Sequence, residues 1–564
     1  YGIFKVDAYP PPVSKKEEFR MKQTTLTQRL LSALVALCMV LSVCAPALAA
    51  EPGRASAAVI TLTKKGKTTG LTPDNVAEAL PKCTMSVNGS KVTLDLSSNT
   101  DRNLLSDAVL TAVNPGTDLE LVCGYEYVTA IDNPVVITGM HDITLSGSGM
   151  AGSLKIENCN GEVSLTAQHN RAVLGRLDID NTAGNGGVTI TGSHQYPLCN
   201  YEGGNTVIAS NGPVKIENKF AFLTGGGTLV GPATRGSLTV TKSRSVEVTG
   251  ASGNDATIIG DADITSDGAV TITNSQGTAV GGKLTVKAGG AVTVTGDTVD
   301  ATKAAIAKGA NITAGGSVNI SNPDGIAVDG GLTVDNTSGD VGDVTVTSNG
   351  EYALKGITTI TSNGAVNITS NSGQVSNEKL TVNKSSGVTV TAVSDDKEAF
   401  LWGSNYTKAP RFANTPKVEI WNKGNEGWVG MVEYVPPDGM GSVYYTSSAS
   451  DAEKHYARNT DDKYNAREAY FRIESAALYT LHTEPEGVTA TTGSTQDTKF
   501  YAGETVTVTA PADTETKKFE SWTLSGKTPS DLSGHWETKN PLTFTMPAGN
   551  VTLTADYKQL YNLT

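Results

Sequence analysis

A short phrase of alternating apolar and polar residues recurs through the middle of this chain of 564 residues. Its copies are VEV at Val246, VTI at Val270, VTV at Val292, VNI at Val318, VTV at Val344, VNI at Val366 and VTV at Val388, at steps of 24, 22, 26, 26, 22 and 22 residues. Two further apolar phrases lie between neighbouring copies, such as TAVGG at Thr278 and LTV at Leu284. A near-constant period with three strand-like phrases indicates a stack of structural repeats.

The alternation within each phrase predicts which side chains form the core. In the second copy, Val270 and Ile272 point one way, while Thr271 and Thr273 point the other. One turn of about 22 residues has too few apolar side chains to bury by itself, but turns stacked at roughly 4.8 Å place valine on valine. The sequence therefore predicts an all-β protein, a parallel β-solenoid with about 22 residues in each three-stranded coil.

Looser copies of the phrase extend the pattern towards the N-terminus, as VTI at Val188 and ITL at Ile143. We therefore place the solenoid at residues 135–401. Its period and pattern resemble the right-handed β-helices of the pectate-lyase-like class and of related carbohydrate-binding surface proteins. The resemblance implies a right-handed coil, but a fold of this kind does not by itself imply a function.

The segment in front of the solenoid, residues 50–134, contains the start signals of a helix. Thr72 is suited to be the N-cap and Pro73 to be the first helical residue, and the apolar residues that follow lie on one face. These signals predict a helix near residues 73–82. Such a helix would cover the open end of the solenoid, where strand edges are otherwise free to pair with other chains.

The start of the chain predicts export. Residues 21–49 combine a basic beginning, the apolar run Leu30–Val43 and the cleavage site Ala47-Leu48-Ala49, which is the pattern of a secretory signal. An apolar run of about fourteen residues is too short to span a bilayer, so we expect no membrane span after signal removal. Residues 1–20 have no initiator methionine, and we interpret them as an upstream extension from a start codon assigned too early.

Charge and cysteine content exclude some classes of function. Lys plus Arg number 44 and Asp plus Glu 57, and the net charge of −13 would repel a nucleic-acid backbone. Four cysteines follow the signal, namely Cys83, Cys123, Cys159 and Cys199. Disulfides and free buried thiols are both compatible with an exported chain. These cysteines form no C-x-x-C pair, so we expect no zinc site among them.

The regular coils have few residues suited to catalysis. Ser245–Pro410 contains no Arg and Gln195–Lys454 contains no His, although a polysaccharide lyase or hydrolase needs acid and base groups. We therefore expect no catalytic residues and no cofactor. Aspartates at the corners could hold a structural Ca²⁺, but turn residues are the simpler interpretation. These aspartates are Asp261, Asp263, Asp267, Asp340 and Asp343.

An alternative site lies around residues 140–200. Its polar residues are His141, Asp142, His169, Arg171, Arg176, Asp178, Asp180 and His194. Their spacing matches no mechanism, and solvated polar residues are the favoured interpretation. They would nevertheless form the site in the alternative interpretation, in which the protein is a carbohydrate-active β-helix, that is, a polysaccharide lyase or hydrolase.

The outward residues of the repeat form a second pattern. They are Thr271/Thr273, Thr293/Thr295, Asn319/Ser321, Thr345/Thr347, Asn367/Thr369 and Thr389/Thr391. A flat ladder of this kind resembles the surface of ice-binding solenoids. Threonine is also a preferred outward residue of strands, and Asn and Ser interrupt the ladder, so we favour the structural interpretation.

Aromatic residues become frequent after Ala399. We interpret residues 402–477 as a capping region that closes the C-terminal end of the solenoid with an aromatic core. Aromatic faces can also stack on sugar rings or bury against a protein partner. The candidate ligand-binding residues are therefore Trp421, Trp428, Tyr444 and Tyr445.

The end of the chain, residues 478–558, is a separate module. Tyr479–Tyr557 contains in order AGETVTVTA, KFESW and NPLTFTMPAGNVTLTADY. This series resembles the divergent B-repeat of internalin-like bacterial surface proteins. The resemblance implies a small β-rich stalk or adhesion unit without catalysis, in which Phe519 and Trp522 fill the core.

Together these features predict a non-catalytic exported bacterial protein, extracellular and either secreted or associated with a cell surface. We expect an adhesin-like role, in which the chain binds or displays to a glycan or to a protein of a host or cell surface.

Overall fold

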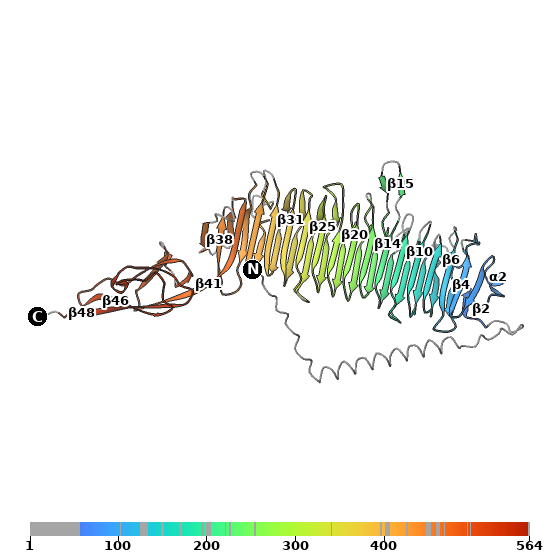
Figure 1. The fold of residues 1–564 in the computed structure, drawn as a ribbon, viewed down its shortest axis with the longest axis horizontal. Coiled ribbons are helices and arrows are strands. Elements are labelled where there is room, and N and C mark those ends of the chain that lie inside the picture. The colour runs from blue at the N-terminus through green and yellow to red at the C-terminus, as the bar shows by residue number, and fades with distance from the viewer. Residues whose placement is uncertain are drawn as a thin grey trace, which may run out of the picture. The chain divides into compact units, whose positions relative to one another are not determined.

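Strands stacked in parallel form a β-solenoid across residues 91–435 (Figure 1). The computed structural model describes residues 57–561 apart from short stretches, which are 102, 125–132, 148–151, 169–171, 193–196, 199–204, 220–221, 225–226, 230, 253–254, 340, 395–397, 401–406, 425–426, 447–452, 458–462, 467, 493–494 and 497. The predicted upstream extension 1–20 and secretory signal 21–49 lie outside the described residues.

Two long parallel sheets, here sheet A and sheet B, make up most of the coil. Sheet B contains β4 (Lys91–Leu96), β6 (Asp118–Cys123), β8 (Ile143–Gly147), β10 (Val163–Ala167), β12 (Val188–Gly192), β14 (Val214–Asn218), β18 (Val246–Gly250), β20 (Val270–Asn274), β22 (Val292–Thr295), β25 (Val318–Asn322), β28 (Val344–Ser348), β31 (Ala365–Ser370), β34 (Gly387–Ala392) and β36 (Lys417–Asn422). Sheet A contains β5 (Val109–Ala112), β7 (Val135–Thr138), β9 (Leu154–Glu157), β11 (Leu177–Asn181), β13 (Thr206–Ser210), β17 (Leu238–Lys242), β19 (Ala262–Ser266), β21 (Leu284–Ala288), β24 (Ala310–Ala314), β27 (Leu332–Asn336), β30 (Thr358–Ser362), β33 (Leu380–Lys384), β35 (Arg411–Ala413) and β37 (Gly430–Val435).

The third side of the coil is shorter. Four of its strands form sheet C, namely β23 (Ala304–Ile306), β26 (Ile326–Asp329), β29 (Tyr352–Lys355) and β32 (Gln374–Ser376). In earlier coils single parallel bridges replace these strands, such as Val173 with Leu198 and Ile258 with Val280. The three apolar phrases of each repeat therefore form three sides, as predicted. A separate antiparallel hairpin joins β15 (Phe222–Thr224) to β16 (Gly227–Leu229).

The alternation predicted from the sequence is confirmed in the core. Val270 and Ile272 of β20 pair in register with Val292 and Val294 of β22, and all four are 0% exposed. Thr271, between the first two, faces outwards and is partly exposed. The same stacking joins the buried residues of the coils into one continuous core.

Many coil strands end in a buried Asn or Ser. Asn274 ends β20, and its Nδ2 donates to the carbonyls of Ser252 at 3.2 Å and Thr278 at 2.7 Å. Ser348 ends β28, and its Oγ donates to the carbonyl of Gly325 at 2.7 Å. These side chains bond backbone groups at the corners, where the chain leaves the sheet ladder. The corners are thus part of the core, although their residues are polar.

The solenoid extends beyond the predicted limits of 135 and 401. Parallel pairing already joins β4 to β6 and still joins β35 to β37. The last coils do not resemble the repeat because aromatic residues replace valine in the core, where Phe412 and Tyr434 are both 0% exposed. The coil limits are therefore corrected to 91 and 435.

Antiparallel strands cover the N-terminal end of the coil. β1 (Ile60–Lys64) pairs with β2 (Lys67–Leu71) and with β5 of sheet A, and β3 (Thr84–Asn88) pairs with β4 of sheet B. Because of these pairings, β4 and β5 have a neighbouring strand on both sides and are not edge strands. The end of the coil is therefore covered mainly by β-strands and not by the predicted helix.

The predicted helix near 73–82 is a single turn, α2 (Val76–Ala79). Its N-cap is Asn75 and not Thr72, because these two residues bond each other in a preceding turn. The Thr72 N–H donates to Asn75 Oδ1 at 2.9 Å, and the Asn75 N–H donates to Thr72 Oγ1 at 3.3 Å. Pro81 ends the helix, since the residue before a proline disfavours the helical conformation.

Antiparallel strands also cover the C-terminal end. They are β38 (Met440–Thr446), β39 (Glu453–Ala457), β40 (Lys463–Ala466) and β41 (Tyr470–Glu484). β41 pairs with both β36 and β38, and β40 pairs with β37. Phe471 and Ile473 of β41 are buried and join the solenoid core. The later part of the predicted region 402–477 thus caps the coil, while its first strands belong to the last coils.

The C-terminal module has its own core. Its remaining elements are β42 (Thr489–Thr492), β43 (Thr495–Gln496), β44 (Lys499–Tyr501), β45 (Thr505–Thr509), β46 (Lys517–Gly526), η2 (Trp536–Thr538), β47 (Leu542–Thr545) and β48 (Val551–Gln559). β48 lies between β41 and β46, and β45 lies between β42 and β47. Trp522 is 2% exposed, and Phe519 packs against it at the core margin with ring centroids 5.3 Å apart.

Among the described residues, no helix has the length and apolar character needed to cross a membrane.

The register of the core predicts unequal effects of a charge on neighbouring residues. Val294→Asp should lower the free energy of unfolding by several kcal/mol, because it buries an unpaired carboxylate at a position that is 0% exposed. Thr293→Asp, on the outer face, should change stability little. Thermal unfolding measured by circular dichroism would show the difference, and equal melting temperatures would refute the register.

The separate core of the module predicts that residues 478–560 fold alone. Its strands bury Phe500, Trp522 and Phe544 without help from the coil, whereas a coil fragment cut at both ends exposes two parallel edges. The excised module should give a dispersed amide NMR spectrum. A spectrum typical of an unfolded chain would contradict this expectation.

Candidate functional site

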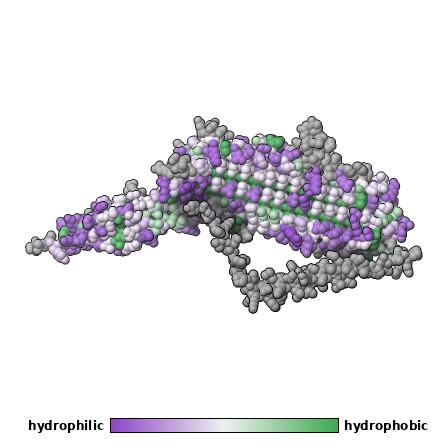
Figure 2. Space-filling view, viewed as in Figure 1, coloured by the Kyte–Doolittle hydropathy of each residue, from purple (hydrophilic) through white to green (hydrophobic). Residues whose placement is uncertain are grey.

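Outward hydroxyl and amide side chains form two ladders on sheet B. From β20 to β34 one column contains Thr271, Thr293, Asn319, Thr345, Asn367 and Thr389, and the other contains Thr273, Thr295, Ser321, Thr347, Thr369 and Thr391. Neither column carries an ionisable group over this length. In the view of Figure 1 the coil surface is largely pale between clusters of hydrophilic residues (Figure 2). The ladders end at Glu419 and Trp421 of β36, which stand in the same columns.

An aromatic platform, defined as Trp421, Tyr445, Tyr470 and Arg472, lies where the ladders end. β41 runs between β36 and β38, so that Tyr470 lies opposite Trp421 and Arg472 lies opposite Tyr445. The ring centroids of Trp421 and Tyr470 are 4.3 Å apart, and the Arg472 guanidinium lies 4.2 Å from the Tyr445 centroid. Trp421 and Tyr445 remain partly exposed. The platform is therefore two accessible rings held by contacts to one strand.

Polar groups surround the rings of the platform. Burial and a hydrogen bond to Glu419 raise the pKa of Tyr470 to about 12, and its hydroxyl donates to Glu419 Oε1 at 3.0 Å. Burial would raise the pKa of Glu419, but Lys417 and Tyr470 outweigh it and lower that pKa. Arg472 is paired with Glu474 at 2.9 Å. The platform thus carries fixed charges of both signs.

The other two predicted ligand-binding residues lie elsewhere. Tyr444 faces the opposite side of β38 from Tyr445, and it packs on Phe471 of the core with centroids 6.2 Å apart. Trp428 is 38% exposed and forms a bridge on the side of the coil that carries sheet C. Of the four predicted residues, only Trp421 and Tyr445 therefore lie on this outer face, on the two strands that flank β41.

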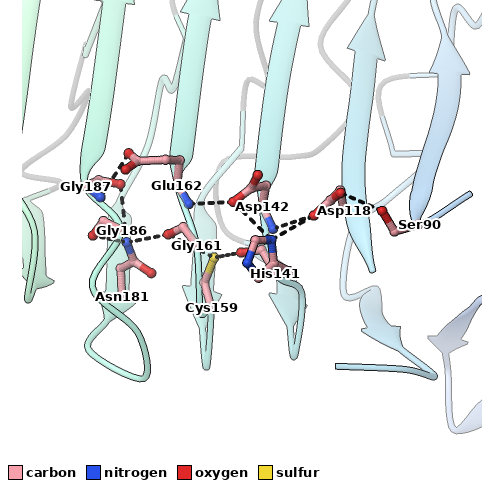
Figure 3. A network of polar contacts seen from close by, with 10 residues as sticks. All are labelled: Ser90, Asp118, His141, Asp142, Cys159, Gly161, Glu162, Asn181, Gly186 and Gly187. Carbon is pink, nitrogen blue, oxygen red and sulfur yellow. Dashed lines mark hydrogen bonds and ion pairs between the residues drawn. The ribbon is translucent and has the colours of Figure 1, made fainter. Parts of the chain in front are cut away.

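A second group of polar residues, here the corner cluster, consists of Asp118, His141 and Asp142 (Figure 3). His141 Nδ1 lies 2.9 Å from Asp118 Oδ1 and 3.3 Å from Asp142 Oδ1. Asp118 begins β6, and the other two residues precede β8 of the next coil. Burial would raise the pKa of Asp118, but hydrogen bonds from Ser90, His141 and the Asp142 N–H outweigh it and lower that pKa.

The carboxylates of this corner form a ladder from coil to coil (Figure 3). Asp118 Oδ1 accepts the N–H of Asp142 at 3.2 Å, and Asp142 Oδ1 accepts the N–H of Glu162 at 2.7 Å. Glu162 Oε2 in turn accepts the N–H of Gly187 at 2.9 Å. Each acid therefore bonds the backbone of the following coil at the start of sheet B.

The structure joins few of the other polar residues predicted around 140–200. Arg176 and Asp178 lie on sheet A and pair with each other at 3.3 Å, while Asp180 accepts a hydrogen bond from Thr182. His169, Arg171 and His194 are outside the described residues. Asp118 is not among the residues predicted from the sequence, although DLEL at Asp118 matches DITL at Asp142 and could have indicated stacking.

Two of the predicted corner aspartates have a structural role. Asp261 Oδ1 accepts the N–H of Lys283 at 2.8 Å, and Asp343 Oδ1 accepts the N–H of Ala365 at 2.8 Å. These are the contacts expected of turn residues. Asp340 is outside the described residues.

The described cysteines are free. Cys83, Cys123 and Cys159 are all buried and form no disulfide, and Cys199 is outside the described residues. Burial raises the pKa of Cys83 to about 11, that of Cys123 to about 12 and that of Cys159 to about 11. These three thiols are structural residues of the core.

The module after the solenoid has the order of motifs, the strands and the separate core described above. Residues 479–560 match the family model of the divergent InlB B-repeat domain. The resemblance expected for 479–557 is confirmed, and this B-repeat domain follows a β-solenoid. Searches of curated proteins and of solved structures give no significant match to the chain.

The raised thiol pKa values predict slow alkylation. At pH 8 the thiolate fraction of Cys83, Cys123 and Cys159 should be small, because burial favours the neutral thiol. Iodoacetamide followed by peptide mass spectrometry should therefore modify them in the unfolded chain but scarcely in the folded one. Rapid labelling of all three in the folded protein would contradict their burial.

Proposed function

We propose that the chain is a non-catalytic exported bacterial protein of the adhesin type, which binds a glycan on the aromatic platform. A divergent InlB B-repeat domain behind a β-solenoid fits a surface protein. The platform supplies the site, because Trp421 and Tyr445 are partly exposed on the same outer face as the hydroxyl ladders. The exposure of two rings on this one face, on either side of β41, is the observation that carries the proposal.

The chemistry of the platform suits sugars. Aromatic faces stack on the apolar faces of sugar rings, and Glu419 and Arg472 offer an acceptor and a donor for sugar hydroxyls beside them. Their positions are fixed, since Glu419 accepts the Tyr470 hydroxyl and Arg472 pairs with Glu474. A site whose polar groups are already held in place loses less conformational entropy on binding.

The charges of the platform support binding without turnover. A glycosidase needs a carboxyl group whose pKa is raised so that it can donate a proton. The pKa of Glu419 is lowered instead, and its Oε2 lies 2.8 Å from Lys417 Nζ. Around residues 140–200, the alternative enzyme site, the described polar residues are divided between the corner cluster and sheet A, and no observation there favours a lyase or hydrolase.

The proposal predicts that the double variant Trp421→Ala/Tyr445→Ala loses binding. Each ring should contribute roughly 1 kcal/mol or more, so the loss of both should weaken binding about thirtyfold or further. Glycan arrays followed by titration of the retained glycan would measure the loss. Trp428→Ala is the matched control, because it removes a 38% exposed ring away from the platform, and melting temperatures would verify that both variants fold.

Three results would contradict the proposal. Full binding by the double variant would place the site elsewhere, for example on the ladders between 271 and 391. Retention of a protein but of no glycan would change the class of ligand. Cleavage of a retained polysaccharide would show that the chain is an enzyme.

A further inference from the structure

The corner cluster presents donor atoms of two kinds at short range. His141 Nδ1 lies 2.9 Å from Asp118 Oδ1 and 3.3 Å from Asp142 Oδ1, and each of the three residues has a ligand atom within 4.8 Å of those of the other two. An ion with Zn–N and Zn–O bonds of about 2.0–2.2 Å holds neighbouring donors in a tetrahedral site roughly 3.3–3.6 Å apart. The distance from His141 to Asp142 already has that length, and the distance from His141 to Asp118 is slightly shorter. From this geometry we propose that the corner cluster binds one divalent transition-metal ion through Asp118, His141 and Asp142.

The carboxylate ladder explains the acids but not the histidine. Asp343 precedes β28 as Asp142 precedes β8, and it accepts the N–H of the next coil in the same way. No imidazole stands beside Asp343, since the residue before it is Gly342. His141 therefore adds a donor that the ladder does not require, at the point where two acids of successive coils are stacked.

Among the described residues, no Lys or Arg pairs with the carboxylates of the cluster. Nearby strand carboxylates have basic partners, as Glu120 has Lys91 at 3.1 Å and Glu157 has Lys155 at 2.6 Å. Within the part of the chain that the structure describes, the ion pairs of Asp118 and Asp142 involve His141 and no Lys or Arg. With a neutral imidazole the corner carries two negative charges, which a divalent cation would neutralise.

Neighbouring groups hold the two carboxylates of the cluster in position. Ser90 Oγ donates to Asp118 Oδ2 at 3.0 Å, and the Glu162 N–H donates to Asp142 Oδ1 at 2.7 Å. Gly161 leaves room for the Asp142 carboxylate, because a Cβ at this position would collide with Oδ1. Contacts of this kind orient metal ligands and increase affinity.

The donor set selects the class of ion. Imidazole together with carboxylates suits Zn²⁺ and its first-row neighbours, whereas Ca²⁺ and Mg²⁺ prefer oxygen alone. The side chains of Asp118, His141 and Asp142 are 29%, 49% and 44% exposed. An ion held there from one side keeps open positions for water or for an oxygen atom of a ligand.

The test is calorimetric titration of Zn²⁺ into the chelator-treated chain from residue 50 onward, which contains every described residue. We expect one site per chain, and we expect His141→Ala, Asp118→Asn and Asp142→Asn each to weaken binding at least tenfold. Ca²⁺ at equal concentration should not compete. Cobalt substitution should give absorption bands without thiolate charge transfer, which separates this site from binding by a cysteine.

Two matched variants serve as controls. His482→Ala removes another exposed histidine–carboxylate pair, in which Nε2 lies 3.0 Å from Glu484, and Asp343→Asn removes an equivalent ladder acid that has no imidazole. Both should bind Zn²⁺ as the parent chain does. His141→Ala should also keep its melting temperature without metal, because the ring is half exposed.

The proposal fails if the parent chain binds no Zn²⁺ with one-to-one saturation. It also fails if His141→Ala binds as tightly as the parent, or if Asp343→Asn and His482→Ala weaken binding as much as the cluster variants do. In those cases His141 serves only as a hydrogen-bond and charge partner of the two acids. The glycan titration of Trp421→Ala/Tyr445→Ala is independent of each of these outcomes.

Discussion

The register between successive coils is the constraint on which the rest of this structure depends. A slip of one residue in a parallel strand would turn its valines outwards and its threonines inwards. Stacked β-branched side chains such as Val292 on Val270 resist that slip along the whole core. The buried Asn and Ser residues at strand ends add a second restraint, because Asn274 meets its carbonyl partners only when the strand stops at that residue. The outward ladders, the aromatic platform and the corner cluster all depend on this register, because it decides which residues of successive strands lie next to each other.

The sequence predicts the regular coils well because each repeat carries the same local pattern. It predicts the two ends of the solenoid poorly. Phe412 and Tyr434 replace valine in the core of the last coils. At the other end, Thr72 and Asn75 hydrogen-bond each other in a turn, so the helix begins later than predicted. Site residues are harder still, because a contact between coils joins residues about one repeat apart. The places of Asp118 and Tyr470 in these sites depend on which strands pair. Composition and spacing do not reveal that pairing.

From the sequence, residues 402–477 could form either a cap or a binding surface. In the structure one strand, β41, contributes both to the cap and to the aromatic platform. Phe471 and Ile473 of β41 point into the solenoid core, while Tyr470, which precedes them, and Arg472, which lies between them, point to the outer face. One antiparallel strand thus covers the edge of a parallel sheet and positions the rings of the platform. Closing the edge removes a surface on which other chains could pair, so the same strand that limits aggregation can carry recognition.

Strand β41 also belongs to two cores, since Phe471 is buried in the solenoid and Leu481 in the B-repeat domain. The chain therefore passes from one core to the other within a single extended strand, Tyr470–Glu484. Tension applied to the B-repeat domain would travel along this backbone into the hydrogen bonds with β36 and β38. The two cores therefore share one backbone segment, and no separate linker lies between them.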